Sequence, residues 1–338
     1  SGQTSPDPLP HDRELRVNET QPKLLMLFYG VVGFLAVVGI LLLVVDKAPK
    51  RGREKVQLVA FLGPALVLLL VGLLIPAIRT VVLSFKGPGS IGWVGLENYE
   101  WMLTTSESQR ILLNTAAWVL LVPLLATSIG LLYAIVIDKA RSEAFAKALV
   151  FMPMAISLVA ASIIWKLVYT VRPEEQAQIG LANQLLVTIG LEPYRFLQDG
   201  PWNTLFLIVI MIWLQTGFAM VILSAAIKAV SADVVEAARL DGVNAWQMFR
   251  NVTLPSIRPA VVVVMVTISI TTLKAFDIVR TTTGGQFDTG VVATALYDQA
   301  FRFGEEGKGS ALAVLLFVLV LPIVVYQVRV LRSQKEVR

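Results

Sequence analysis

Long, uninterrupted apolar runs are the feature that most constrains how this chain can fold. A helix that crosses a bilayer needs roughly 20 consecutive apolar residues, whereas the strands of a membrane barrel are about 10 residues long and alternate in polarity. Only 16% of the residues are charged, against about 25% in ordinary soluble domains. We therefore expect an all-α integral membrane protein with about seven transmembrane helices, at Leu24–Val45, Gln57–Phe85, Ile111–Ile137, Ala146–Tyr169, Thr204–Ile227, Pro259–Val279 and Ala311–Val330.

The segments between these runs differ in their content of Lys and Arg. Basic residues are more frequent in the segments that follow the first, third, fifth and seventh runs than in the remaining segments. In multi-pass membrane proteins the short loops rich in Lys and Arg stay in the cytoplasm. The sequence therefore predicts a multi-pass protein whose N-terminus is outside and whose C-terminus is cytoplasmic.

Several classes of function are disfavoured by composition. The chain has no Cys, and its single histidine, His11, lies in a polar N-terminal stretch; we therefore expect no metal site and no catalytic residues. Basic residues form no patch with interleaved aromatics, so nucleic acid is not an expected partner. The phosphate-binding pattern G-x-x-x-x-G-K-[ST] is missing, because Gly307-Lys308-Gly309 lacks both the upstream glycine and the hydroxyl residue. Any ATPase that serves this protein must be another chain.

The cytoplasmic segment 231–255 reads as two short helices joined by a turn. Ser231 can cap the first helix, and Asp233 lies in its positively polarised first turn. Gly242 suits the left-handed position that ends a helix. Asn244 can cap the second helix, which Pro255 is expected to close. An apolar side that is exposed outside the membrane indicates docking, and this segment has one at Val235, Ala238, Trp246 and Phe249.

The residues of this segment resemble the signature cytoplasmic loop of ABC-importer permeases. Glu236-Ala237-Ala238 is followed by Gly242 and then by Val252-x-Leu254-Pro255, with Val at a position where Ile is usual. Other segments resemble sugar permeases, although Gln286 stands where a Pro commonly follows the glycine pair. They are Trp93–Tyr99, Phe151–Pro153, Trp165–Tyr169, Gly180–Leu186 and Thr283–Gly285. From Gln57 to the C-terminus the chain resembles the first permease subunit of maltose and α-glucoside importers.

The resemblance implies a six-helix permease core preceded by one accessory helix. Residues 1–23 would form an external polar tail, 24–56 the accessory helix with a basic cytoplasmic loop, 57–331 the permease domain and 332–338 a cytoplasmic tail. The expected function is the permease subunit of an ATP-driven importer for maltose, trehalose or another α-glucoside or oligosaccharide, in a bacterial inner or plasma membrane. The implied partners are membrane lipid, an ABC ATPase dimer that binds ATP and Mg, a second permease subunit and an external sugar-binding protein.

The resemblance also implies which residues act. Segment 231–255 would be the coupling loop that docks on the ATPase, through Glu236, Ala237, Ala238, Asp241, Gly242, Trp246, Phe249, Leu254 and Pro255. Sugar contacts of the maltose permease fall on Leu214, Gln215, Phe218, Thr271 and Lys274, with Gln215 and Lys274 in place of a Gly and an Asn. Trp213 adds an aromatic face to this candidate substrate path.

Two further residues leave alternatives open. Lys274 and Asp277 lie three residues apart within an apolar run, so we expect them, with Thr271, on one helix face. They can pair with each other, or they can line a path for a sugar, whose hydroxyls need both donors and acceptors. A secondary transporter or channel that uses this pair as a proton relay is the alternative function, although the coupling-loop pattern has no role in it.

Overall fold

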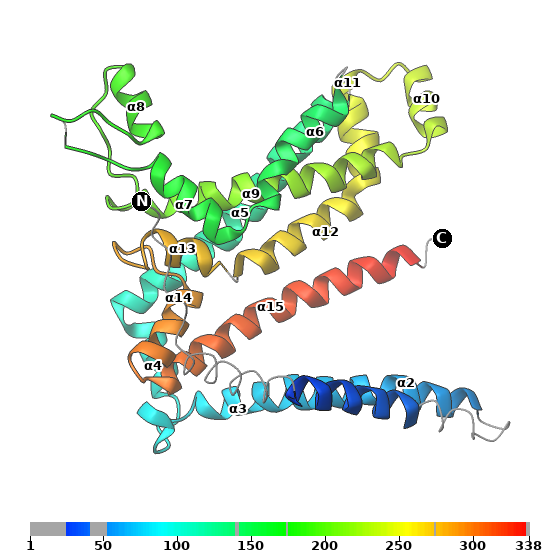
Figure 1. The fold of residues 1–338 in the computed structure, drawn as a ribbon. Coiled ribbons are helices and arrows are strands. Elements are labelled where there is room, and N and C mark those ends of the chain that lie inside the picture. The colour runs from blue at the N-terminus through cyan, green and yellow to red at the C-terminus, as the bar shows by residue number, and fades with distance from the viewer. Residues whose placement is uncertain (1–24, 41–52, 139–141, 174, 274, 336–338) are drawn as a thin grey trace, which may run out of the picture. The chain divides into compact units, whose positions relative to one another are not determined.

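The computed structural model describes residues 25–40, 53–138, 142–173, 175–273 and 275–335 (Figure 1). Regular structure in these residues is helical, apart from an isolated β-bridge between Lys86 and Trp93. The prediction of an all-α protein is confirmed. The chain divides into two compact units, Ser1–Ile78 and Arg79–Arg338, each of which is described separately.

The first unit contains a helix at Leu25–Ile40 and a second, longer stretch. That stretch comprises α2 (Arg53–Leu69), a π-helical turn at Leu70–Leu74 and the start of α3 (Ile75–Leu83). The carbonyl with which the ring of Pro76 would collide belongs to Gly72, four residues earlier, inside the π-helical turn. A wider turn relieves such a collision. Gln57–Leu83 is long and apolar enough to cross a membrane, as predicted.

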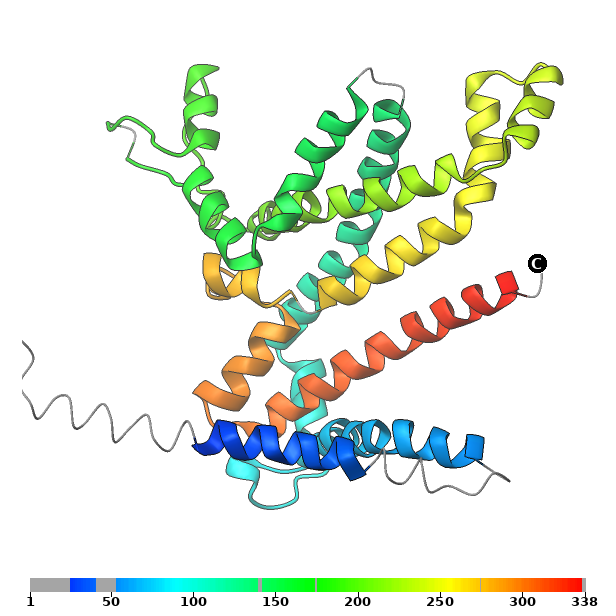
Figure 2. The same cartoon turned by 45° about the vertical axis from the view of Figure 1, so that its right-hand side comes forward.

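The second unit is built around two long helices that lie side by side, α5 (Ser106–Ile137) and α9 (Asn203–Lys228) (Figures 1 and 2). Their close approach depends on Gly130, because a Cβ at this position would lie 2.6 Å from the Cβ of Ala219 and 2.8 Å from the backbone nitrogen of Met220. Large side chains pack tightly along the same contact and form the core of the unit, among them Trp118, Leu207, Met211, Met220 and Leu223.

The span that was predicted as one helix at Ala146–Tyr169 is broken. It consists of α6 (Glu143–Phe151), a 3₁₀ turn at Met152–Ala155 and α7 (Leu158–Val168), and the two halves are bent by 100°. Pro153 is the second residue of the 3₁₀ turn. At the start of α7, the Ser157 hydroxyl accepts a hydrogen bond from the backbone nitrogen of Ala160. The expectation of a continuous span is therefore wrong: a proline and a new N-cap meet inside the apolar run.

The span predicted at Pro259–Val279 is displaced in the structure. α12 begins at Leu254 and ends at Leu273, and a separate short helix, α13, covers Asp277–Thr282 and packs against α7. Asp277 and Thr271 therefore do not lie on one continuous helix. Apolar character extended the predicted span, but the hydrogen-bonded helix ends within the run.

The second unit contains further elements besides these helices. They are a 3₁₀ turn at Pro88–Ser90, α4 (Glu97–Thr104), α8 (Leu181–Thr188), α14 (Val292–Tyr297), a π-helical turn at Asp298–Arg302 and α15 (Glu306–Lys335). α8 lies in the chain between α7 and α9. α10 (Ala232–Leu240) and α11 (Ala245–Gln247) lie at one end of the α5–α9 pair, and α8 and α14 lie toward the other end (Figure 1).

Two buried asparagines fasten loops at the end of the unit that carries α8. The side-chain nitrogen of Asn183 donates to the carbonyls of Thr170 and Tyr194, at 3.0 and 3.1 Å, and its oxygen accepts from the backbone nitrogen of Tyr194 at 2.7 Å. Asn98 donates likewise to the carbonyls of Ser84 and Lys86. Each asparagine satisfies backbone groups that no helix would satisfy.

The number of spans falls short of the prediction in the described part of the chain. Five helices there are long and apolar enough to cross a membrane, or six if the bent pair α6–α7 counts as one span. The run at Leu24–Val45 is represented by the shorter helix Leu25–Ile40, and the rest of that run lies outside the described residues.

Gly130→Ala tests the closeness of the two central helices. The added methyl group must push α5 away from the α9 backbone, and overpacking of this kind costs roughly 1–3 kcal/mol. We expect the unfolding temperature of the detergent-purified protein to fall. Gly72→Ala is the matched control, because a Cβ there meets no atom within 4 Å. Equal unfolding temperatures for the two variants would show that the α5–α9 contact is looser than described.

Candidate functional site

The turn inside the predicted coupling loop has the geometry that the sequence indicates. α10 (Ala232–Leu240) ends in front of Gly242, whose φ of +78° lies in the left-handed region. The backbone nitrogens of Gly242 and Val243 donate to the carbonyls of Arg239 and Ala238, at 3.0 and 3.3 Å. These bonds satisfy the last carbonyls of the helix. The left-handed conformation predicted for Gly242 is confirmed.

The second half of the loop starts as predicted but ends differently. Asn244 and Gln247 form a reciprocal capping box, with both hydrogen bonds at 2.8 Å, at the start of α11 (Ala245–Gln247). Pro255 does not close this helix, because a π-helical turn at Met248–Thr253 leads without interruption into α12. The carbonyl that would clash with the Pro255 ring belongs to Asn251, inside the widened turn.

Side chains of the loop fall into an outward and an inward set. Leu240 and Trp246 are 89% and 66% exposed, and Glu236, Ala237 and Asp241 are exposed as well. Val235 and Phe249 turn inward and line a cavity of about 420 Å³. The apolar side predicted from the sequence is therefore divided, with Trp246 available for docking and Val235 beneath the loop.

The cavity lies between the loop and the ends of the two central helices. Ile135 of α5 and its C-cap residue Asp138 line it, together with Ile227 of α9 and Val230, which follows α9. Arg239 of α10 lines the cavity from the side of the loop. A partly apolar space thus separates the loop from these helix ends.

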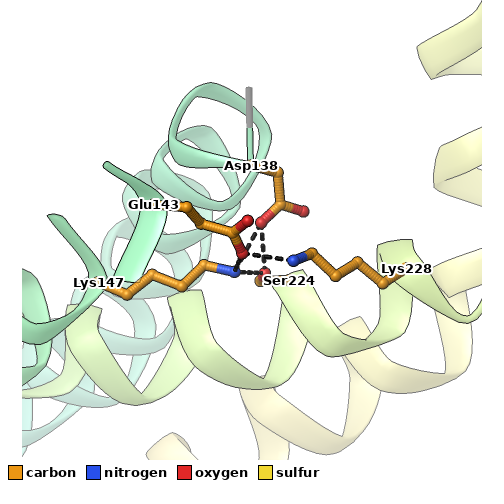
Figure 3. Close-up of polar contacts among 5 residues, drawn as sticks. All are labelled: Asp138, Glu143, Lys147, Ser224 and Lys228. Carbon is orange, nitrogen blue, oxygen red and sulfur yellow. Dashed lines mark hydrogen bonds and ion pairs between the residues drawn. The ribbon is translucent and has the colours of Figure 1, made fainter. Parts of the chain in front are cut away.

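A network of charged side chains holds α5, α6 and α9 together next to this cavity (Figure 3). The Lys147 ammonium group lies 2.6 Å from Oδ1 of Asp138 and 2.7 Å from Oε1 of Glu143. Lys228 also binds Glu143, and the Ser224 hydroxyl donates to Oδ1 of Asp138 at 2.7 Å while accepting from Lys147. We call these five residues the ionic cluster. Sequence reasoning did not predict this cluster.

The candidate substrate path is only partly assembled in the described residues. On α9, Leu214 is buried in the core, whereas Trp213, Gln215 and Phe218 are half-buried. Trp213 packs edge-on against Trp165 of α7, with ring centroids 5.8 Å apart.

Across from α9, the hydroxyl of Thr271 donates to the Thr267 carbonyl at 2.9 Å. Asp277 lies in the first turn of α13. Lys274 lies outside the described residues, so its pairing with Asp277 is not tested.

Comparison with known proteins identifies the family. The model of the family described as "Binding-protein-dependent transport system inner membrane component" matches residues 126–335. This match includes the entire predicted coupling loop. The chain belongs to this family.

Named relatives and a solved structure agree with this assignment. An osmoprotective compounds uptake permease of Synechocystis sp. is 44% identical over 82% of this chain and 100% of its own length. An α-glucoside transport system permease of Rhizobium meliloti is 44% identical over 80% of each chain. A subunit of a bacterial ABC transporter involved in the import of alginate superposes with a TM-score of 0.70 and 25% identity, over 84% of this chain and 98% of its own.

Family membership decides several of the expectations. The chain is a multi-pass membrane permease subunit of an ABC importer and not an enzyme, as the sequence predicted. The ion-driven secondary transporter that was considered as an alternative is not supported. The roles of individual residues in coupling and in the substrate path stay predictions.

Lys147→Met tests whether the ionic cluster holds the bundle together. Removing this ammonium group leaves Asp138 without a cation beside it, in a site where both side chains are largely buried. We expect a clear loss of thermal stability in detergent. Lys228→Met is the control, because the Lys228 side chain is 53% exposed and its ion pair is screened by solvent. Equal losses in the two variants would contradict a special role for Lys147.

Proposed function

We propose that this chain forms part of the translocation path of an ABC importer for α-glucosides, such as maltose or trehalose, or for related oligosaccharides. The observation that carries the proposal is the coupling loop, with its left-handed Gly242 and its exposed apolar residues, at one end of the helix bundle. The sugar class is supported by the α-glucoside and trehalose/maltose permeases among the relatives.

Coupling to a separate ATPase dimer, which binds ATP and Mg, would occur through the outward side of the loop. Trp246 and Leu240 offer apolar area to a groove, and Glu236 and Asp241 offer carboxylates beside it. Apolar anchors that are surrounded by charged residues are typical of specific docking sites. Gly242, Leu254 and Pro255 would set the geometry of this surface instead of binding the partner themselves.

The two ends of the helix bundle would then lie on opposite sides of the membrane and contact different partners. If the coupling loop is cytoplasmic, the end of the bundle that carries α8 and α14 faces outward (Figure 1). A sugar-binding protein would dock there, as the description of the family implies. A second permease subunit would complete the path, and the N-terminus would be outside with the C-terminus in the cytoplasm.

Gln215 is the residue of α9 best suited to contact a sugar. Its amide is half-buried in an apolar span and forms no hydrogen bond with the described residues. Polar groups inside a membrane span usually face a partner or a water-filled cavity. Phe218 lies three residues further along the same face and offers an apolar surface for a sugar ring. Leu214 packs into the core, so its expected contact with sugar is the weakest of the set.

Reconstituted transport tests the proposed function directly. The permease, its ATPase, its partner permease and the sugar-binding protein are placed in vesicles, with ATP or a non-hydrolysable analogue in the compartment of the ATPase. Uptake of maltose and trehalose should require ATP and the binding protein. ATP-dependent uptake of osmoprotectants, without uptake of any α-glucoside, would overturn the sugar class. Uptake that is driven by an ion gradient without ATP would overturn the assignment of the protein to an ATP-driven importer.

Gly242→Val should uncouple the ATPase. A β-branched residue in the left-handed region costs roughly 1–2 kcal/mol and misdirects α11. We expect normal membrane insertion but a reduced yield of ATPase in co-purification. Gly190→Val is a matched control, since Gly190 has a φ of +81° and equally open surroundings but belongs to the loop after α8. Normal co-purification and normal sugar-stimulated hydrolysis by Gly242→Val would count against this role of the turn.

Gln215→Ala should reduce sugar uptake or change sugar preference while assembly stays normal. The substitution removes an amide that can bind a hydroxyl, and such a hydrogen bond contributes about 0.5–1.5 kcal/mol. Initial uptake rates across a panel of α- and β-linked disaccharides measure the effect. Val209→Ala is the control, because Val209 is a surface residue of the same helix. Uptake rates equal to those of the unmodified protein for every disaccharide would show that Gln215 does not contact the sugar.

A further inference from the structure

Asp138 is the C-cap residue of α5, and its carboxylate has an acceptor oxygen that no described residue uses. Its backbone caps the helix, where a carboxylate faces the negative end of the helix dipole and is unfavourable without a cation. Oδ1 meets this need through Lys147 and Ser224. Oδ2 is buried and has no hydrogen-bond partner among the described residues. Figure 3 shows this second oxygen directed away from the rest of the ionic cluster.

A cation that has no ion-pair partner among the described residues lines the neighbouring cavity from the side of the loop. Arg239 occupies the last turn of α10 and lines the same 420 Å³ cavity as Asp138. Its side chain is exposed and forms no ion pair with any described residue. Val235 lies one helical turn earlier and lines the cavity as well, so both residues belong to the face of α10 that borders the cavity.

We propose that Asp138 and Arg239 form an ion pair across this cavity when the coupling loop moves toward the bundle. Asp138 is then a positioning residue that transmits a displacement of the loop to α5 and α9. This inference rests on the proposed function, because a movement of the loop presupposes a partner that drives it.

The chemistry of the site suits this additional ion pair. A carboxylate has about four acceptor positions, so Oδ2 can bind a guanidinium group while Oδ1 keeps Lys147 and Ser224. Within the ionic cluster two carboxylates face two ammonium groups, and no existing pair has to break. Closing the partly apolar cavity excludes water from the new contact and strengthens it. The open cavity separates the two charges, which explains why the pair is absent in this arrangement.

Cross-linking measures the approach of the two walls. The chain has no native Cys, so Ile135→Cys together with Val235→Cys reports on the cavity alone. The complete importer is reconstituted with its ATPase and sugar-binding protein, and oxidative cross-linking is compared without nucleotide and after trapping with ATP and vanadate. We expect the cross-link to increase in the trapped state. In an Arg239→Gln background this increase should fall by about fivefold or more, since the loss of one charged partner weakens the closed state.

Sugar-uptake rates of single and double variants show whether Asp138 and Arg239 act as a pair or independently. Asp138→Asn and Arg239→Gln should each lower the uptake rate about tenfold. The double variant should be no slower than the slower single variant, because both changes remove one interaction. Arg239→Lys should recover part of the rate. Lys228→Gln removes a cation of the ionic cluster that does not line the cavity and should leave the cross-linking pattern as it is.

Two results would overturn the pair. One is a nucleotide-dependent cross-link that Arg239→Gln leaves intact, and the other is an effect of the double variant equal to the product of the single effects. An exposed arginine can be replaced without unfolding, so the Arg239→Gln arm holds even if Asp138→Asn proves unstable. Absence of ATP-dependent sugar uptake in the unmodified complex would instead reject the proposed function, and the pair with it.

Discussion

The architecture of the second unit depends on the close approach of α5 and α9. Gly130 has no side chain, and this allows the two backbones to touch over a length where Trp118 and Met211 can fill the flanks. α12 packs on both helices, and α6 reaches α9 at Gly217, where a Cβ would lie 2.6 Å from the Val150 carbonyl oxygen. Backbone contact between helices is common in membranes, because lipid offers no hydrophobic drive for their association. Two small residues thus decide where the other helices can pack.

The two ends of this helix pair are secured by different chemistry. At the end with α8, Asn183 and Asn98 fix loops through hydrogen bonds to backbone carbonyls, which are neutral and short-ranged. At the loop end, the ionic cluster joins three helices through charges. Charged groups near a helix end can exchange partners without loss of the backbone hydrogen bonds, whereas an asparagine that satisfies loop carbonyls cannot. One end is therefore built to hold a shape, and the other to tolerate rearrangement.

Local signals allowed much of the fold to be predicted from the sequence. Gly242 was identified by the left-handed conformation that glycine permits, Asn244 by the capping hydrogen bond that its side chain can form, and α9 by its uniform apolar run. Hydropathy could not predict the bend at Pro153, because apolar residues continue through it, and the predicted sixth span ran past Lys274 and Asp277 although α12 ends at Leu273. The ionic cluster was visible only in part: Glu143 and Lys147 lie four residues apart on one helix, but Lys147 and Asp138 are separated from Ser224 by 77 and 86 residues. Contacts of that kind depend on which helices pack, and no pattern along the chain encodes them.

The bend between α6 and α7 has a mechanical consequence. A helix transmits force along its axis through its ladder of backbone hydrogen bonds, and at Met152–Ile156 this ladder changes direction by 100°. α6 is joined to α9 by the ion pair between Glu143 and Lys228, whereas α7 packs against α13 and also touches α9 through Trp165 and Trp213. No unbroken helical ladder connects the two halves, so a push along α6 is not carried straight along α7 and passes instead through these side contacts.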